Sequence, residues 1–172
     1  SSFGAKKQMT NFKVSALVMD VDGTLTDGQI HISPTGEAFK SFDVKDGYAV
    51  HDLLPQMGIV PVIITGRHSD IVAHRAKELG IQELHQSVAD KGALLREIAA
   101  RYGLSREEIA CIGDDCNDLP MMELCGICAC PADAVQTVKK KCDYVCKAKG
   151  GRGAVREFVE WLMENNAPCG TG

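Results

Sequence analysis

The sequence predicts an α/β protein in which helices cover both faces of a mainly parallel sheet. Short apolar segments alternate with amphipathic segments along the chain, polar residues follow several of the apolar segments, and glycines stand where helices should end. Strand–helix alternation of this kind is typical of parallel sheets that are buried on both faces. We expect one domain over residues 1–172, because a chain of this length is enough for one hydrophobic core.

The predicted strands are short runs of apolar residues, the clearest of which is Val14-Ser-Ala-Leu-Val-Met-Asp-Val21. Apolar runs without alternation are typical of strands buried on both faces. By this criterion we expect strands at 14–20, 59–64, 109–112, 126–129 and 143–146, and a weaker one at 82–86.

The segments between these strands have the periodicity of amphipathic helices. Gly58, Gly80 and Gly103 follow three of them, where a left-handed residue commonly ends a helix. The pattern Ser105-Arg-Glu-Glu108 is a capping box and predicts a short helical turn before the strand at 109–112. We expect helices at about 47–57, 69–79, 91–102, 116–125, 132–140 and 153–165.

One segment, from Gly28 to Phe42, departs from the alternation of strands and helices. Its residues alternate between apolar and polar around Ser33-Pro-Thr-Gly36, which predicts a β-hairpin. A two-stranded hairpin is marginally stable on its own, so its apolar residues need a surface to cover. The sequence shows no second, cap domain. We therefore expect a hairpin at about 28–42, either as a flap over the active site or packed against another subunit.

Charge and hydropathy argue against several classes of function. The net charge of −4 provides no broad basic surface, so we expect no nucleic-acid partner. No apolar run reaches the roughly 18 residues of a membrane span. The first residues, Ser-Ser-Phe-Gly-Ala-Lys-Lys-Gln, lack the apolar core of a signal peptide. We expect a cytoplasmic protein without a membrane partner.

Eight cysteines stand after residue 110 and allow two interpretations. The spacing Cys125-x-x-Cys128-x-Cys130 could supply thiolates to zinc, with a later cysteine completing the site. Against this, Cys111 and Cys128 lie within apolar runs, where cysteine behaves as a small hydrophobic residue. We favour packing residues over a zinc site or a disulfide framework, and we extend this interpretation to Cys116.

Polar side chains stand at the carboxyl ends of three predicted strands and at the amino end of one helix. They are Asp20 and Asp22, Thr65-Gly66-Arg67, Asp90-Lys91-Gly92 and Gly113-Asp114-Asp115-Cys116-Asn117-Asp118. In parallel α/β sheets these ends meet at one edge, where ligands bind. Two carboxylates as close in sequence as Asp20 and Asp22 repel each other and are costly to bury. The sequence therefore predicts a cation at this edge.

Magnesium suits this set of residues, because it takes oxygen ligands and is usually held by one or two carboxylates plus substrate phosphate. Asp20 and Asp114 are the natural side-chain ligands, and the backbone carbonyl of Asp22 can add a third. Thr65 and Lys91 can donate hydrogen bonds to phosphate oxygens. A carboxylate such as Asp20 can also attack phosphorus, and its neighbour Asp22 can exchange protons with the leaving alcohol and with water.

The segments Asp20-Val-Asp-Gly-Thr24, Thr65-Gly-Arg67, Asp90-Lys-Gly92 and Gly113 to Asp118, in this order, resemble the four motifs of the haloacid dehalogenase (HAD) superfamily of phosphohydrolases. Two further segments, Asp43-Val-Lys-Asp-Gly-Tyr48 and the tail sequence from Gly150 to Phe158, resemble more narrowly the capless, tetrameric branch of that superfamily. This branch is typified by 3-deoxy-D-manno-octulosonate 8-phosphate (KDO 8-phosphate) phosphatase. The resemblance implies a Rossmann-like, HAD-like sheet, Mg²⁺, a homotetramer, and hydrolysis of a small acidic sugar phosphate through an aspartyl-phosphate.

The resemblance also implies a role for each motif residue. Asp20 is then the nucleophile, Asp22 the general acid and base, and Asp114 the residue that completes the magnesium site. Thr65 and Lys91 bind the transferring phosphoryl group. The carboxylate of Asp115 orients the ligands or the catalytic lysine, together with its neighbours Asn117 and Asp118.

Substrate contacts carry over from the family to the segment Asp43–Tyr48, which follows the hairpin, and to the region after the second motif. They are Asp22, Asp43, Val44, Lys45, Asp46, Gly47, His51, Gly66, Arg67, Arg75 and Lys91. In the tail, over 150–172, the small residues before Arg152 suggest that this side chain contacts an adjacent active site in the tetramer.

Several alternatives to KDO 8-phosphate hydrolysis remain open at this point. The octulosonate enzymes tend to carry an arginine shortly after the segment that corresponds to Asp43–Tyr48, where this chain has His51. The alternative substrates are therefore 2-keto-3-deoxynononate 9-phosphate and N-acylneuraminate 9-phosphate. The chain could also be a non-catalytic, tetramerising module such as those found in sialic-acid-activating enzymes. Such modules typically lack an acid of the first or fourth motif, and the presence of both here favours catalysis. Asp20 and Asp22 alone would also suit a structural calcium site or a receiver-type phosphoacceptor, but receivers lack the Asp-x-Asp-Gly-Thr turn.

Overall fold

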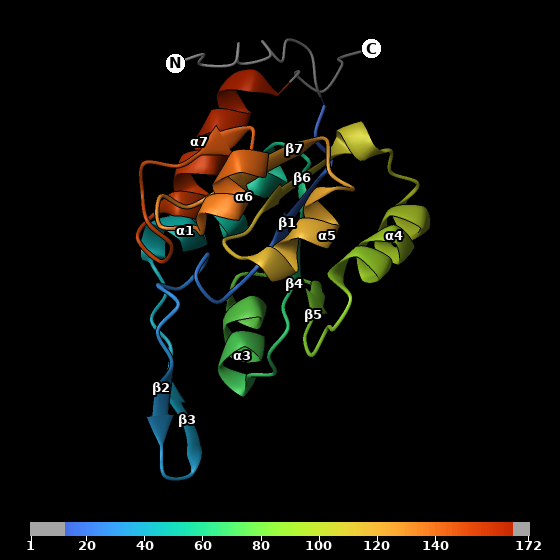
Figure 1. The fold of residues 1–172 in the computed structure, drawn as a ribbon. Coiled ribbons are helices and arrows are strands. Elements are labelled where there is room, and N and C mark those ends of the chain that lie inside the picture. The colour runs from blue at the N-terminus through green and yellow to red at the C-terminus, as the bar shows by residue number, and fades with distance from the viewer. Residues whose placement is uncertain (1–12, 167–172) are drawn as a thin grey trace.

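The computed structural model describes residues 13–166, which form a six-stranded parallel sheet with helices on both faces (Figure 1). The strand order is β5-β4-β1-β6-β7-β8, and all neighbouring pairs are parallel. The strands are β1 Ala16–Met19, β4 Val60–Ile64, β5 Glu83–His85, β6 Ile109–Ile112, β7 Ile127–Cys130 and β8 Tyr144–Val145. The chain runs outward from β1 through β4 to β5 and then crosses to β6 on the other side of β1. The carboxyl end of β1 is therefore at the point where ligands bind in such sheets.

Helices pack on the two faces through separate hydrophobic clusters. The helical elements are α1 Val44–Tyr48, a π-helix η1 Ala49–Leu53, α2 Leu54–Gln56, α3 Asp70–Glu78, α4 Lys91–Tyr102, α5 Leu119–Met122, α6 Gln136–Lys141, α7 Ala154–Asn165, and the 3₁₀ turns η2 Arg106–Glu108 and η3 Cys116–Asp118. Leu17 and Met19 of β1 join the cluster that contains η1, α3 and α7 residues. Val18, between them, joins the cluster of α4, α5 and α6. Because side chains alternate along a strand, this single apolar run supplies both cores.

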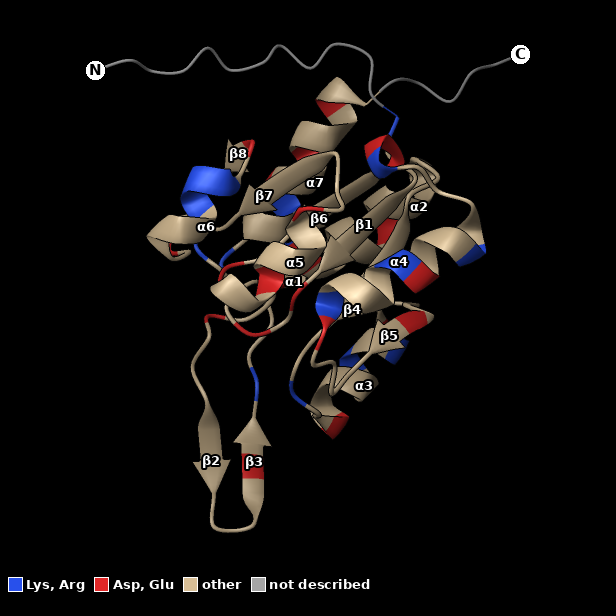
Figure 2. Ribbon diagram, turned by 45° about the vertical axis from the view of Figure 1, so that its right-hand side comes forward, with Lys and Arg blue, Asp and Glu red and all other residues tan. Residues whose placement is uncertain are grey.

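A two-stranded antiparallel hairpin, β2 His31–Ser33 and β3 Gly36–Phe39, is inserted between β1 and α1. It extends away from the rest of the molecule, and β2 carries no charged residue (Figures 1 and 2). Ile32 is 75% exposed and Phe39 is 53% exposed. The prediction of a hairpin is confirmed, and the segment that separates β1 from α1 is this hairpin rather than a cap domain.

The α/β prediction is confirmed, and the main differences lie at the ends of elements. The first strand ends at Met19, so both predicted catalytic aspartates lie in the loop that follows it. The helix expected at 47–57 begins at Val44, because the side chain of Asp43 accepts a hydrogen bond from Lys45 N and caps it. The helix expected at 116–125 begins as a 3₁₀ turn, and α6 begins at Gln136 rather than 132.

Within the described residues, no helix is long and apolar enough to cross a membrane.

Candidate active site

The site lies where the carboxyl ends of β1, β4 and β6 meet. An open pocket of about 170 Å³ is lined there by residues of three predicted motifs: Asp20, Asp22, Thr65, Gly66, Arg67, Asp114, Asp115 and Asn117. The register aligns Met19 of β1 with Ile63 and Ile112, so the three loops begin at the same level of the sheet. The sheet therefore brings together residues that are up to about a hundred positions apart.

The turn after β1 is compact and places Asp20 and Asp22 at the mouth of the sheet. The backbone N–H groups of Thr24, Leu25 and Thr26 all donate to the carbonyl of Val21. Gly23 has a φ of 85°, and a Cβ atom there would overlap the Asp114 carboxylate. This turn thus requires glycine, both for its backbone conformation and for the close approach of the fourth motif.

Lys91 is the buried cation of the site. It is 2% exposed, and its Nζ donates to Asp20 Oδ1 at 3.0 Å and to Asp118 Oδ1 at 2.7 Å. Burial alone would lower the pKa of Lys91, but the charges of Asp20 and Asp118 outweigh burial and raise it. The ammonium group is positioned because Asp90 caps α4 by accepting from Ala93 N at 3.0 Å.

Asp118 holds the fourth motif in place and is fully buried. Its Oδ2 accepts hydrogen bonds from the backbone N–H groups of Asp114 and Asp115, at 3.0 and 3.2 Å. Of the residues expected to orient the ligands or Lys91, it is Asp118 that contacts Lys91, whereas Asp115 caps η3 by accepting from Cys116 N. A role of Asp115 in orienting the ligands stays a prediction. Asp118, three residues after Asp115, lies on the buried side of the turn, where Lys91 is.

The carboxylates of Asp20, Asp114 and Asp118 lie close enough together to hold a metal ion. Burial, followed by the charge of Asp118, raises the pKa of Asp20 well above its ordinary value. Burial and the neighbouring charges of Asp118 and Asp115 raise the pKa of Asp114 to about 6. Asp114 Oδ1 is buried and has no hydrogen-bond partner. An oxygen cluster with an orphaned atom and too little positive charge fits a hard divalent cation such as Mg²⁺.

Asp22 has a partner that the sequence analysis did not identify. Lys40, which follows β3, donates from Nζ to Asp22 Oδ1 at 2.6 Å and to Glu37 Oε1 at 3.1 Å. Glu37 Oε2 in turn accepts from Ser69 Oγ at 2.5 Å. Periodicity and motif spacing give no signal for this set, because Lys40 lies in a hairpin arm where a lysine is ordinary.

The predicted substrate contacts fall into three groups. Asp22, Gly66 and Arg67 line the pocket, together with the predicted phosphate ligand Thr65, which is 2% exposed. Lys91 contacts Asp20 directly beneath it. The contact of these residues with substrate stays a prediction.

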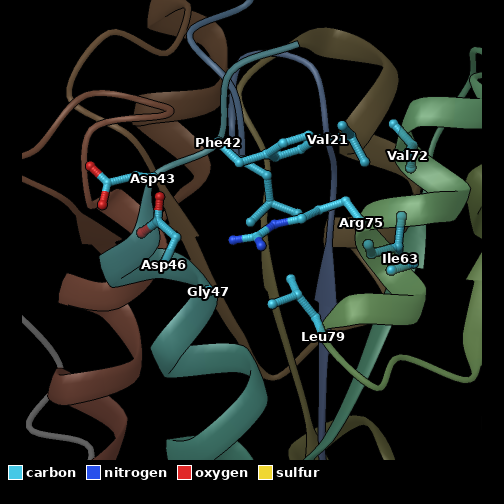
Figure 3. A pocket seen from close by; sticks show the side chains of 11 residues that line it. Val21, Phe42, Asp43, Asp46, Gly47, Ile63, Val72, Arg75 and Leu79 are labelled. Carbon is cyan, nitrogen blue, oxygen red and sulfur yellow. The ribbon is translucent and has the colours of Figure 1, made fainter. Parts of the chain in front are cut away.

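A second group surrounds a narrow, mainly apolar cavity beside α1 (Figure 3). Asp43, Asp46, Gly47 and Arg75 line it, with the Arg75 guanidinium 5.6 Å from the centre of the Phe42 ring. Asp46 is 2% exposed and accepts from Arg156 N at 2.9 Å, so its carboxylate caps α7, whose own N-cap is a glycine. Asp46 Oδ1 is therefore engaged in the helix cap, whereas Asp46 Oδ2 is buried without a hydrogen-bond partner, and the contact of Asp46 with substrate stays a prediction.

The third group lies on exposed surface. Val44 is 80% exposed, Lys45 is exposed, and His51 Nδ1 is 3.1 Å from Asp52 Oδ1 on η1. None of these three lines the pocket formed by the motif residues. Their contact with substrate stays a prediction.

The backbone of the Gly-rich tail sequence packs against the turn after β1 of its own chain. Gly151 N donates to Thr24 O at 3.1 Å, and a Cβ atom on Gly150 would overlap the Gly23 carbonyl. These glycines permit close approach to the turn after β1 of the same subunit. Only the side chain of Arg152 remains exposed, and its contact in trans stays a prediction.

The described cysteines are mostly buried, as packing residues are expected to be: Cys111, Cys125, Cys128, Cys130 and Cys146. Among the residues that the structure describes, no cluster of cysteines is close enough to bind a metal ion. Cys116 is exposed on η3, so its interpretation as a packing residue is wrong. Cys169 lies outside the described residues.

Residues 66–158 match the family model described as haloacid dehalogenase-like hydrolase. The 3-deoxy-D-manno-octulosonate 8-phosphate phosphatase KdsC of Yersinia pestis is 39% identical over 150 residues, which cover 87% of this chain and 80% of that protein. The chain belongs to the haloacid dehalogenase-like hydrolase family. The resemblance indicated by the four motifs is thereby confirmed.

Solved structures of such phosphatases share the fold of this HAD-like chain. The cobalt-bound enzyme from Haemophilus influenzae matches with a TM-score of 0.85 and 36% identity, covering 89% of each chain. The enzyme from Moraxella catarrhalis, in complex with magnesium, phosphate and KDO, matches with a TM-score of 0.85 and 37% identity over 89% of this chain and 87% of that one. These similarities confirm the HAD-like fold.

Proposed function

We propose that this protein is a magnesium-dependent phosphomonoesterase that hydrolyses KDO 8-phosphate to KDO and phosphate. The observation that carries the proposal is the contact of Lys91 with Asp20 at 3.0 Å, together with the open pocket that Asp20 lines along with Thr65 and Asp114. A carboxylate, an ammonium group and a hydroxyl at one strand edge are the groups that phosphoryl transfer to an aspartate needs. The names of the relatives support KDO 8-phosphate as the substrate.

In the proposed reaction, a carboxylate oxygen of Asp20 attacks phosphorus, and the bond from phosphorus to the sugar oxygen breaks. Asp22 gives its proton to the leaving alcohol. Asp22 then takes a proton from water, whose oxygen attacks phosphorus and releases phosphate and the Asp20 carboxylate. Thr65 and Lys91 donate hydrogen bonds to the phosphoryl oxygens throughout. Mg²⁺, when bound by Asp20, Asp114 and the Asp22 carbonyl, supplies positive charge that offsets these carboxylates and the phosphate.

A screen of three sugar acid phosphates tests the substrate. With Mg²⁺ present, we expect phosphate release from KDO 8-phosphate to have a kcat/KM at least about tenfold above that from the nononate and neuraminate 9-phosphates, a difference of roughly 1.4 kcal/mol. Preference for a 9-phosphate would reassign the substrate within the branch. Turnover of a small neutral sugar phosphate alone would refute the branch, and a lack of any turnover would support the non-catalytic alternative. Excess chelator should abolish activity, and full activity in chelator would remove the metal from the proposal.

The proposal includes a homotetramer in which hairpins of neighbouring subunits pack together. Its support is the exposed apolar surface of the hairpin, formed by Ile30, Ile32 and Phe39. A pocket that is open to solvent also needs a cover that excludes water during phosphoryl transfer. Sedimentation of the unchanged protein at assay concentration tests this, and a fully active monomer would refute it. The exposed Arg152 is proposed to reach an adjacent pocket, so Arg152→Ala should raise KM several-fold without changing the sedimentation coefficient. The cytoplasmic location stays a prediction.

A further inference from the structure

Lys40 is a buried cation that none of the four motifs contains. Its side chain is only 3% exposed, although it follows a hairpin whose own strands are largely exposed. Its Nζ lies between Asp22 Oδ1, at 2.6 Å, and Glu37 Oε1, at 3.1 Å. Removing an ammonium group from water is costly, and here two carboxylates offset that cost.

The contacts of Lys40 continue into the second motif region. Glu37 accepts from Ser69 Oγ at 2.5 Å, and Ser69 Oγ accepts from Val72 N at 3.2 Å as the cap of α3. Ser69 N also donates to Gln86 Oε1 at 2.8 Å. A chain of polar contacts thus joins the loop after β1, the hairpin and the start of α3, just beyond Thr65-Gly66-Arg67.

The two aspartates of the first motif therefore have separate lysines. Lys91 comes from the start of α4 and holds Asp20, whereas Lys40 comes from the hairpin and holds Asp22. The bond from Lys40 occupies Oδ1 of Asp22. Oδ2 is then the oxygen left for proton exchange, and the carboxylate cannot rotate freely about its terminal torsion without losing a short, charge-assisted bond.

We propose that Lys40 is a positioning residue that fixes the Asp22 carboxylate for protonation of the leaving alcohol. The inference rests on the proposed function, because it needs Asp22 as the general acid. Lys40 acts through Asp22 and does not contact the phosphoryl group. Its loss should therefore impair only those reactions in which the leaving group needs a proton.

A comparison of two substrates tests this role. An alkyl phosphate, such as the sugar acid phosphate, releases a strongly basic alkoxide and needs a general acid, whereas p-nitrophenyl phosphate releases a stable phenolate and does not. General acid catalysis contributes about 10² to 10⁴-fold. In Lys40→Met we expect kcat/KM for the alkyl phosphate to fall about 100-fold and that for p-nitrophenyl phosphate to fall less than about threefold. Lys40→Arg, which keeps the charge, should recover most of the loss.

Several companion variants decide between this role and others. In an Asp22→Asn background, Lys40→Met should have almost no further effect, because residues that act as a unit are not additive. Glu37→Gln should show the same dependence on the leaving group, with a smaller loss of kcat/KM. This variant replaces Lys40→Met in the test if Lys40→Met does not fold. Lys77→Met, which changes an exposed lysine of α3, should leave both substrates unaffected.

Two results would overturn the proposal. Equal losses on both substrates with a raised inhibition constant for inorganic phosphate would indicate that Lys40 binds the phosphoryl group directly. Additive losses with Asp22→Asn would indicate independent action. If Asp22→Asn itself kept full activity on the alkyl phosphate, the proposed function of Asp22 would fail, which is distinguishable from a failure of Lys40 alone.

Discussion

The carboxyl edge of the sheet and the hairpin contribute to the same site in opposite ways. At the sheet edge, Asp20, Lys91 and Asp118 are at most 5% exposed, and Lys91 contacts both carboxylates. The hairpin has no core of its own, and Ile32 and Phe39 are more than half exposed. We infer that the fold of one subunit fixes the reacting groups, whereas the hairpin segment positions Asp22 and covers the pocket of the proposed tetramer.

This comparison predicts the largest effect at the sheet edge. Asp20→Asn keeps the shape of the side chain but removes the proposed nucleophile, so we expect kcat to fall by at least about 1,000-fold, or roughly 4 kcal/mol in activation free energy. Steady-state phosphate release measures kcat, and circular dichroism checks the fold. Asp70→Asn, at a carboxylate whose side chain is 98% exposed, is the matched control. A loss of less than about tenfold would refute the role of Asp20.

Replacing each of the two lysines by methionine compares the regions directly. Lys91→Met leaves Asp20 and Asp118 buried without a counter-charge, so we expect the free energy of unfolding to fall by about 3–5 kcal/mol. Lys40→Met leaves two carboxylates that water can reach, and the expected loss is about 1 kcal/mol. Urea unfolding at neutral pH measures both. Equal losses would show that the hairpin contact is as much a part of the core as Lys91.

The pH dependence of the unfolding free energy should reveal the ionisation of Asp46, whose carboxylate caps α7. Burial, opposed by the hydrogen bond from Arg156 N, raises the pKa of Asp46 to about 6. Between about pH 4 and 6 the folded chain keeps a proton that the unfolded chain has lost, so this group's contribution is present below about pH 4 and is lost as pH rises to about 6. Over this pH range the ionisation of Asp46 should lower the unfolding free energy by about 3 kcal/mol.

In Asp46→Asn this pH-dependent contribution should disappear, because the amide oxygen still accepts from Arg156 N but cannot ionise. Urea unfolding of this variant and of the unchanged protein at several pH values between 4 and 7 measures the difference. Asp70→Asn should follow the unchanged protein. A difference that does not vary with pH would show that Asp46 is not a buried titrating group.

The smallest effect on chemistry is expected from the apolar residues of the hairpin. Replacing Ile32 and Phe39 together by serine should convert the proposed tetramer to monomers, with little change in unfolding free energy, because neither side chain is in the core. Turnover should fall only about tenfold, roughly 1.4 kcal/mol, since Asp20 and Lys91 stay in place. Sedimentation measures the assembly. A variant that remains tetrameric would show that the hairpins do not form the interface.

Local patterns predicted the strands and the helix ends well, because they depend on neighbouring residues. Gly58, Gly80 and Gly103 all have φ near 65–70°, as expected of residues that end helices. The 3₁₀ turn at Arg106–Glu108 has the expected capping box. The predicted start of α1 lies three residues too late, because apolar periodicity does not register the cap that the neighbouring Asp43 provides to Lys45 N.

The sequence by itself determined which residues meet at the site, because the carboxyl ends of adjacent parallel strands share one edge. Asp20, Thr65 and Asp114 therefore line one pocket, as their positions after predicted strands require. Only the tertiary structure decided which charges pair there. Lys91 pairs with Asp118 rather than Asp115, Lys40 with Asp22 across 18 positions, and Asp46 caps a helix 110 positions away. Such pairs depend on which side chains become buried together, and desolvation then forces each buried charge to find a partner that no local pattern specifies.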